Sequence, residues 1–307
     1  MKNYLIKSSE YLLSLGLLMS ACSNSNQNST QTTKKNTTME KTTFVQPAKN
    51  PADVADGFHE AWKNQDINRL GIYFDAKTKF YPPEGDPVIG WEKIKQQLLP
   101  FIEDQEPSVI ENTDVIVFEN QDYAIRKDHW QMKSLKDGKL LSENMALEVF
   151  RKTEEGNWVY VIDAPFQSNY KSEALKGIDT GDGLTPEMVE ELFHEAWKNQ
   201  NIDKIGEVFT EKTKYFSENG NDKFVVGWTE IKKNLAPFLE QPSILKHTFS
   251  NIFQNENIAL VKAHWELRSP EGELMGESDA VELLEKTENG NWVYVIDAPF
   301  VQFTKEN

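Results

Sequence analysis

The segment 124–130 places two opposite charges beside a tryptophan on one side of the chain. Ala124, Arg126, Asp128 and Trp130 alternate along it, so a strand here would carry all four on one face. If that face lines a pocket, Asp128 is a candidate general base, with a pKa set by burial and by the Arg126 guanidinium. The alternative, which we favour, is that the pair lies in solvent at the pocket mouth or at the strand end.

The five histidines form no obvious catalytic group. His129 and His264 fall on the strand face opposite the tryptophans, which predicts an outer sheet surface or a domain contact. His59 and His194 lie at the edge of a helical apolar stripe, as surface histidines do, and His247 has no counterpart and no assigned role. We find no metal-ligand spacing, no nucleophile motif and no phosphate loop, so we predict no metal and no cofactor.

The tryptophans are a second candidate feature. All eight fall into pairs across an internal repeat, which gives four to each half. They could line a pocket for an apolar or ring-shaped ligand, although the interpretation that we favour is a simple core. The pocket candidates among them are Trp62, Trp130, Trp197 and Trp265.

The N-terminus indicates export. Its apolar run, YLLSLGLLM at 11–19, is about nine residues long, whereas a spanning helix needs roughly twenty. The following sequence, Met19 to Cys22 (MSAC), resembles the bacterial lipobox, although Leu is usual where Met19 stands. The resemblance implies a signal peptide over 1–21 that is cleaved before a diacylated Cys22. The alternative is a plain secretory signal with a chance cysteine.

Acylation at Cys22 would anchor the protein stably to a membrane, because two or three acyl chains suffice where one does not. The protein would then be extracytoplasmic, at a cell surface or in a periplasm. Residues 22–50 are rich in Ser, Asn, Thr, Gln and Lys, which predicts a disordered tether. A net charge of −16 makes nucleic acid an unsuitable partner and opposes docking on anionic headgroups.

The rest of the chain repeats itself. FHEAWKNQ occurs at 58–65 and 193–200, and NWVYVIDAPF at 157–166 and 291–300. A period near 135 residues is too long for a solenoid and indicates two whole domains, which we place at 51–168 and 185–303. The polar segment 169–184 between them, including GIDTGDG, is a linker.

Each copy begins with helices and continues with strands. Asn50-Pro51 and Thr185-Pro186 are N-cap signals, and a later helix starts after Gly90 or Gly227 and ends near a proline. Alternating segments follow, such as IALVKAHWEL at 258–267, with glycine turns between strands. This order predicts an α+β fold with an antiparallel sheet.

The two halves also share a spaced pattern that resembles the nuclear transport factor 2-like superfamily, most closely its SnoaL-like branch. The residues that carry the resemblance are Trp62, Asp66, Leu70, Phe74, Gly90, Trp130, Trp158 and Asp163, and in the second copy Trp197, Asn201, Ile205, Phe209, Gly227, Trp265, Trp292 and Asp297. It implies two cone-shaped domains, each a curved, mostly antiparallel sheet wrapped around N-terminal helices, with a pocket between them.

The resemblance also concerns the site and the assembly. It implies that an acidic residue near Asp163 or Asp297 can face the cavity, against the simpler interpretation of a carboxylate that accepts backbone N–H groups at the strand end. It further implies that such domains pair through the outer sheet face, here as an intramolecular pseudo-dimer.

The function that we favour from sequence is binding of a small molecule or a protein partner without catalysis. The copies share their tryptophans but not Asp128, and no nucleophile is evident. The alternative is an isomerase, cyclase or hydrolase with a carboxylate base in the first-domain pocket, for which Asp128, Arg126 and Asp163 are the candidates.

Overall fold

The computed structural model describes residues 46–103, 106–167, 185–217, 223–301 and 303. The predicted signal peptide, Cys22, most of the tether and the linker 169–184 lie outside the described residues. Within those ranges no helix is long and apolar enough to cross a membrane.

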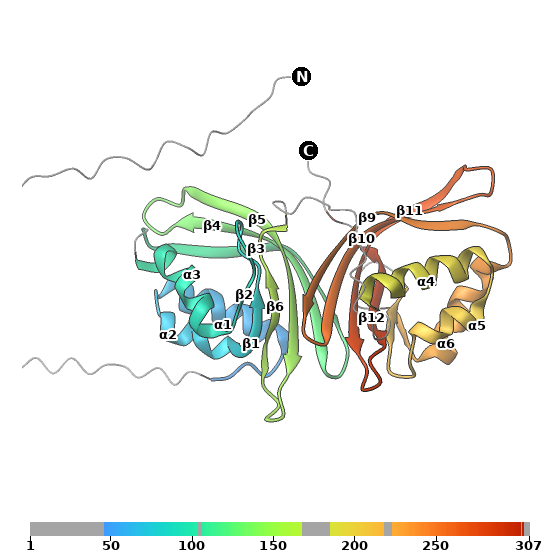
Figure 1. Cartoon of the computed structure of the whole chain (residues 1–307). Helices are drawn as coiled ribbons and strands as arrows, with labels where there is room; N and C mark the ends of the chain where they lie inside the picture. The colour runs from blue at the N-terminus through green and yellow to red at the C-terminus, as the bar shows by residue number, and fades with distance from the viewer. Residues whose placement is uncertain (1–45, 104–105, 168–184, 218–222, 302, 304–307) are drawn as a thin grey trace, which may run out of the picture. The chain divides into compact units, whose positions relative to one another are not determined.

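The first domain runs from helices into a sheet (Figure 1). Its helices are α1 (Pro51–Lys63), α2 (Ile67–Leu70), a 3₁₀ turn (Gly71–Tyr73) and α3 (Trp91–Glu103). Its strands are β1 (Phe74–Phe80), β2 (Val88–Ile89), β3 (Ser108–Glu119), β4 (Tyr123–Ser134), β5 (Leu140–Lys152) and β6 (Trp158–Ala164).

The second domain repeats this order. Its helices are α4 (Pro186–Lys198), α5 (Ile202–Ile205), a 3₁₀ turn (Gly206–Val208), α6 (Trp228–Leu235) and a closing 3₁₀ turn (Ala236–Leu239). Its strands are β7 (Lys214–Phe216), β8 (Phe224–Val226), β9 (Ile244–Asn255), β10 (Ile258–Arg268), β11 (Leu274–Lys286) and β12 (Trp292–Val301).

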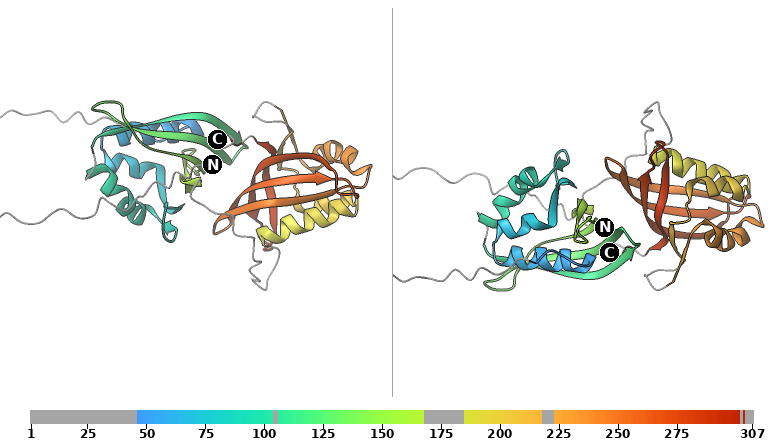
Figure 2. Two further views of the ribbon diagram at one scale, coloured as in Figure 1. Left: turned by 90° about the horizontal axis from the view of Figure 1, so that it is seen from above. Right: turned by 90° about the horizontal axis from the view of Figure 1, so that it is seen from below.

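Each domain holds one mixed, mostly antiparallel sheet. The strand orders are β2-β1-β6-β5-β4-β3 and β8-β7-β12-β11-β10-β9, and only β1 with β6 and β12 with β7 pair in parallel. Each sheet curves around its helices, and α4 lies along the second sheet (Figure 2). The predicted fold class, α+β with a curved sheet around N-terminal helices in each of two domains, is confirmed.

Local chemistry explains the helix starts. The Asn50 side chain accepts a hydrogen bond from the Asp53 amide in a reciprocal capping box, and Thr185 accepts one from Met188. Two expectations from sequence were wrong in detail. Helix α3 continues past Pro100 to Glu103, and the edge strands β3 and β9 were missed because their polar and apolar residues do not alternate strictly.

Three apolar cores form. Two of them lie between the helices and the inner face of one sheet each. The third is built from both domains. It contains Tyr81, Phe118, Ile125, Leu147, Val149, Val161, Ile162 and Ala164 with Phe216, Phe253, Ile258, Leu260, Val281, Leu283, Val295, Ile296, Ala298 and Val301.

The contacts around this shared core come in reciprocal pairs. Lys79 Nζ donates to the Gln254 carbonyl at 2.8 Å, and Lys214, its counterpart, donates to the Glu119 carbonyl at 2.7 Å. The ring of Tyr81 packs edge-on against Phe253 at 5.0 Å. Its counterpart pair is Phe216 and Phe118, whose rings are 4.9 Å apart. Such reciprocity is the property of an isologous, two-fold interface.

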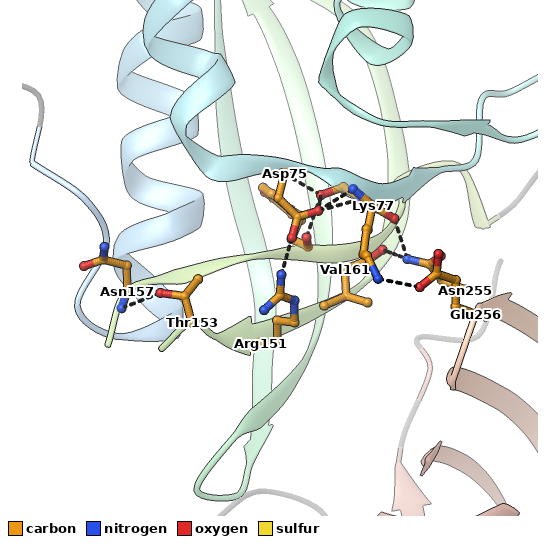
Figure 3. Close-up of polar contacts among 10 residues, drawn as sticks. Asp75, Lys77, Arg151, Thr153, Asn157, Val161, Asn255 and Glu256 are labelled. Carbon is orange, nitrogen blue, oxygen red and sulfur yellow. Dashed lines mark hydrogen bonds and ion pairs between the residues drawn. The ribbon is translucent and has the colours of Figure 1, made fainter. Parts of the chain in front are cut away.

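Two buried or half-buried asparagines complete the pattern. Asn255 Nδ2 donates to the carbonyl oxygens of Lys77 and Val161 at 2.7 and 2.9 Å, and Lys77 also pairs with Glu256 (Figure 3). Its counterpart Asn120 donates to the Val295 carbonyl at 3.2 Å. The described residues from 46 onward accordingly belong to one compact unit.

Candidate functional site

A row of charged side chains crosses the inner face of the first sheet. Arg126 on β4 is the cross-strand partner of Glu148 on β5, and Glu148 is the partner of Asp163 on β6. Direct partners on adjacent strands point to the same face. Asp128, two residues after Arg126, lies on that face as well, so one guanidinium and three carboxyl groups share it.

The contacts within this row are close and shielded from solvent. Arg126 Nε donates to Asp128 Oδ2 at 2.6 Å and lies 3.6 Å from Glu148 Oε2. The two ion-pair partners are only 5% and 1% exposed. The favoured expectation that Arg126 and Asp128 lie in solvent at a pocket mouth or strand end is therefore wrong. The cause is that β4 continues to Ser134, which puts both residues in the middle of the strand.

Burial governs the ionisation of these groups. It raises the pKa of Asp163 to about 7, with the nearby charge of Asp128 adding to the effect. Burial and Asp128 also raise the pKa of Glu148 well above its usual value. Burial raises the pKa of Asp128 too, although Arg126 opposes this. At neutral pH the row therefore keeps protons that exposed carboxylates would lose.

The row opens onto a cavity of about 750 Å³ between the sheet and the helices. Trp62 and Trp130 line it with Asp128, Glu148 and Asp163. The indole N–H groups are fixed, since Trp62 donates to Ser108 Oγ at 3.0 Å and Trp130 to the Pro165 carbonyl at 2.6 Å. The aromatic walls are thereby held in place.

His59, on α1, also faces this cavity. Burial, helped by the charge of Arg126, lowers the pKa of His59 to about 4, so the imidazole is neutral at pH 7. The expectation of surface histidines at His59 and His194 is wrong, because both line cavities. The apolar stripes of α1 and α4 face the inside of each domain, and the two histidines lie on the same side of these helices.

The second domain keeps part of the row and changes the rest. Glu282 and Asp297 are cross-strand partners on β11 and β12, as Glu148 and Asp163 are on the first sheet. Val261 and Ala263 replace the Arg–Asp pair and belong to the apolar core. Burial, with Glu190 adding to it, raises the pKa of Asp297 to about 8. Burial and Glu190 also raise the pKa of Glu282 well above its usual range.

In the second domain, a partner for a buried carboxylate comes from a different element. His247 Nδ1, on β9, lies 2.8 Å from Oε2 of Glu190 on α4. The hydroxyl of Tyr294 donates to the other carboxylate oxygen of Glu190 at 2.8 Å. Burial alone would raise the pKa of Glu190, but the charge and hydrogen bond of His247 outweigh it and lower this pKa to about 2.

His194 lies one helical turn after Glu190, and its ring is 4.4 Å from that of His247. Burial lowers the pKa of His194 to about 4, and the charge of His247 contributes. The three side chains border a smaller cavity of about 110 Å³, together with Trp197, Trp265 and Asp297.

Sequence reasoning missed Glu148, Glu190, Glu282 and the role of His247. One available signal was the glutamate inside the apolar segments MALEVF and DAVELL, which recurs in both copies. Another was the contrast between copies, because Glu190 and His247 stand where the first copy has Ala55 and Asn112. The sequence has no metal-ligand spacing. It therefore did not reveal the group of Glu190, His194 and His247, which only the tertiary structure brings together.

Residues 189–295 match the family model described as the SnoaL-like domain. This match lies within the second domain. The first half has the same order of helices and strands and the same strand order in its sheet. The chain thus contains two domains of one fold. No curated protein matches it.

Solved structures that are similar to part of this chain include proteins of unknown function. One, from Nostoc punctiforme and described as having a cystatin-like fold, is 16% identical over 37% of this chain and 84% of its own, with a TM-score of 0.34. Another, an NTF-2-like protein from Shewanella oneidensis, is 26% identical over 36% of this chain and 93% of its own, with a TM-score of 0.30.

The charge row yields a prediction about stability. Arg126→Val, which introduces the second-domain residue, should lower the free energy of unfolding by about 3–5 kcal/mol, because it leaves Asp128 buried without its partner. The double variant Arg126→Val/Asp128→Ala should be more stable than the single variant. Urea denaturation measures both, and a double variant less stable than Arg126→Val would contradict this account.

Proposed function

We propose that this protein is a lipid-anchored, extracytoplasmic binding protein whose first domain holds a small, uncharged or cationic, mainly aromatic or apolar molecule without catalysis. The observation that carries the proposal is the difference between the two cavities, about 750 Å³ in the first domain and about 110 Å³ in the second. Ligand pockets usually measure about 300–1,000 Å³, so only the first cavity has the size for an organic molecule.

The lining decides the charge of the ligand. Five acidic residues border the first cavity, and no lysine or arginine borders it within the described chain; the acids are Glu84, Glu106, Asp128, Glu148 and Asp163. His59 is neutral there. No lysine or arginine of the described lining attracts an anionic ligand, whereas a hydrogen-bond donor or an amine would find carboxyl oxygens as acceptors.

The aromatic walls favour a flat ligand. Phe58, Trp62, Phe101, Trp130 and Phe166 all line the first cavity. Ring faces attract cations as well as other rings. An aromatic amine can therefore gain both a ring–ring contact and a cation–π contact with an indole. Aromatic amines therefore combine both preferences of this cavity.

Two probes of nearly equal shape and opposite charge test this. Tryptamine should bind at least about tenfold more tightly than indole-3-acetate, because the same ring then carries an ammonium in place of a carboxylate. Isothermal titration calorimetry of the purified protein measures both. Equal binding of the two probes, or tighter binding of the carboxylate, would contradict the proposed preference of this cavity for a cationic ligand.

Matched tryptophan variants locate the site. Trp130→Ala in the first domain should weaken tryptamine binding by about tenfold or more, and Trp265→Ala, its second-domain counterpart, should leave it unchanged. Circular dichroism shows whether each variant is folded. If Trp265→Ala removes binding and Trp130→Ala does not, the assignment to the first domain is wrong.

A second candidate function is proton transfer in the same cavity, and Asp163 is the observation that favours it. Its carboxyl is buried, lines the cavity and has a pKa near 7, where a general base works best at neutral pH. Arg126 and Asp128 act behind it as neighbouring charges. This is the chemistry of an isomerase or a related enzyme that removes a proton next to a carbonyl group.

Deuterium exchange separates the two functions. If Asp163 is a base, the protein in D₂O should exchange the α-protons of a probe ketone such as cyclohexanone, with a rate that rises as pH passes about 7 and Asp163 loses its proton. NMR follows the exchange. Asp163→Asn should abolish it and Asp297→Asn should spare it; a rate no greater than that of buffer excludes catalysis on such ketones.

The anchor belongs to the proposal as well, and it rests on the sequence around Cys22. Growing the producing bacterium with an alkyne-tagged palmitate should label the wild-type protein and place it in the membrane fraction. Cys22→Ser should be unlabelled and released, because the thiol that carries the diacylglycerol is gone. Labelling that persists in Cys22→Ser, or a wild type without label, would refute the anchor.

A further inference from the structure

Three side chains of the second domain converge from two elements. Glu190 and His194 are four residues apart on α4, so both point to the same side of that helix. His247 comes from β9, the edge strand that packs against α4. Among the described residues, this is the group of three whose potential ligand atoms all lie within 4.8 Å of one another.

We propose that Glu190, His194 and His247 form a site for a divalent transition-metal ion, of which zinc suits the donors best. Two imidazoles and one carboxylate are a ligand set that zinc prefers, at bond lengths of about 2.0–2.2 Å. Such bonds in a tetrahedron place neighbouring ligand atoms about 3.3 Å apart. The Glu190–His247 distance of 2.8 Å and the limit of 4.8 Å enclose this value, so modest side-chain rotations complete the site.

The surroundings also fit a bound cation. Glu282 and Asp297 add two buried carboxyl groups beside Glu190, and the described lining of this cavity has no lysine or arginine. The Tyr294 hydroxyl holds Glu190 in position from behind, as outer hydrogen bonds do for metal ligands. The ion would meet preoriented donors, with two further carboxyl groups close by.

Three protein ligands leave a fourth position open. The cavity of about 110 Å³ that the same side chains border has room for water or a small ligand at that position. An open position is characteristic of reactive rather than purely structural zinc sites.

The first domain supplies a natural comparison. It keeps His59 at the position of His194, but Ala55 and Asn112 stand where the second domain has Glu190 and His247. Only one of the three metal-ligand side chains is kept, so the first domain has no corresponding metal site. The inference is independent of the proposed ligand of the first cavity.

The test is zinc binding by the full-length protein after treatment with EDTA. Equilibrium dialysis followed by elemental analysis should give one tightly bound Zn²⁺ per chain. Glu190→Ala/His247→Asn, which restores the first-domain residues, should weaken this binding at least about 100-fold, because two of three ligands are lost. His264→Asn, which removes an outer-face histidine beside Asp279, should bind as the wild type does.

Two further readouts keep the test decisive if a variant folds poorly. Zn²⁺ should raise the melting temperature of the wild type, because it binds the folded state. Co²⁺ should give the intense visible absorption of a tetrahedral site in the wild type and in His264→Asn. Absence of tight Zn²⁺ binding in the wild type, or its loss in His264→Asn, would overturn the proposal.

Discussion

The outer faces of the two sheets pack into one apolar core, and this packing decides which face of each sheet is left for a site. Ile125 and Leu147 of the first domain lie in it with Leu260 and Val281, their counterparts on the second sheet. Side chains alternate between the two faces of a strand. The neighbours of these residues in sequence must therefore point to the opposite face, toward the helices. The paired glutamates and aspartates of both domains thus lie on the cavity side.

The buried carboxyl groups on the cavity side need a proton or an oppositely charged partner, and the two domains supply different partners. A glutamate and an aspartate face each other on the inner side of both sheets, as Glu148 with Asp163 and Glu282 with Asp297. Buried carboxylates require a partner or a proton. The first domain places Arg126 in the same row, whereas the second has Val261 there and brings His247 from the edge strand to Glu190.

Duplication explains how two sites arose on one frame. The anchoring features are shared, such as the Trp62 indole bonded to Ser108 and the Trp197 indole bonded to Ser243, both at 3.0 Å. Four exchanges between the copies, at or beside the cavities, change the chemistry of the sites. They are Ala55 and Glu190, Asn112 and His247, Arg126 and Val261, and Asp128 and Ala263.

The sequence was sufficient for the fold and insufficient for the site. Helix caps such as Thr185, alternation in β10 and the repeat itself are local signals, so the α+β class and the two domains followed from them. The ionisation of Asp163 depends on burial among strands distant in sequence, which no local pattern carries. His247 was left without a role because its strand lacks strict alternation and its partners lie more than fifty residues earlier.

We propose that the two domains act as a fixed intramolecular pair, on the basis of the reciprocal contacts of Lys79 with Lys214 and of Asn120 with Asn255. The most direct test inserts a specific protease site into the linker 169–184, cleaves it and applies the product to size-exclusion chromatography with native mass spectrometry. The account predicts that both fragments elute together as a one-to-one complex at micromolar concentration. Fragments that elute separately while each remains folded would contradict it.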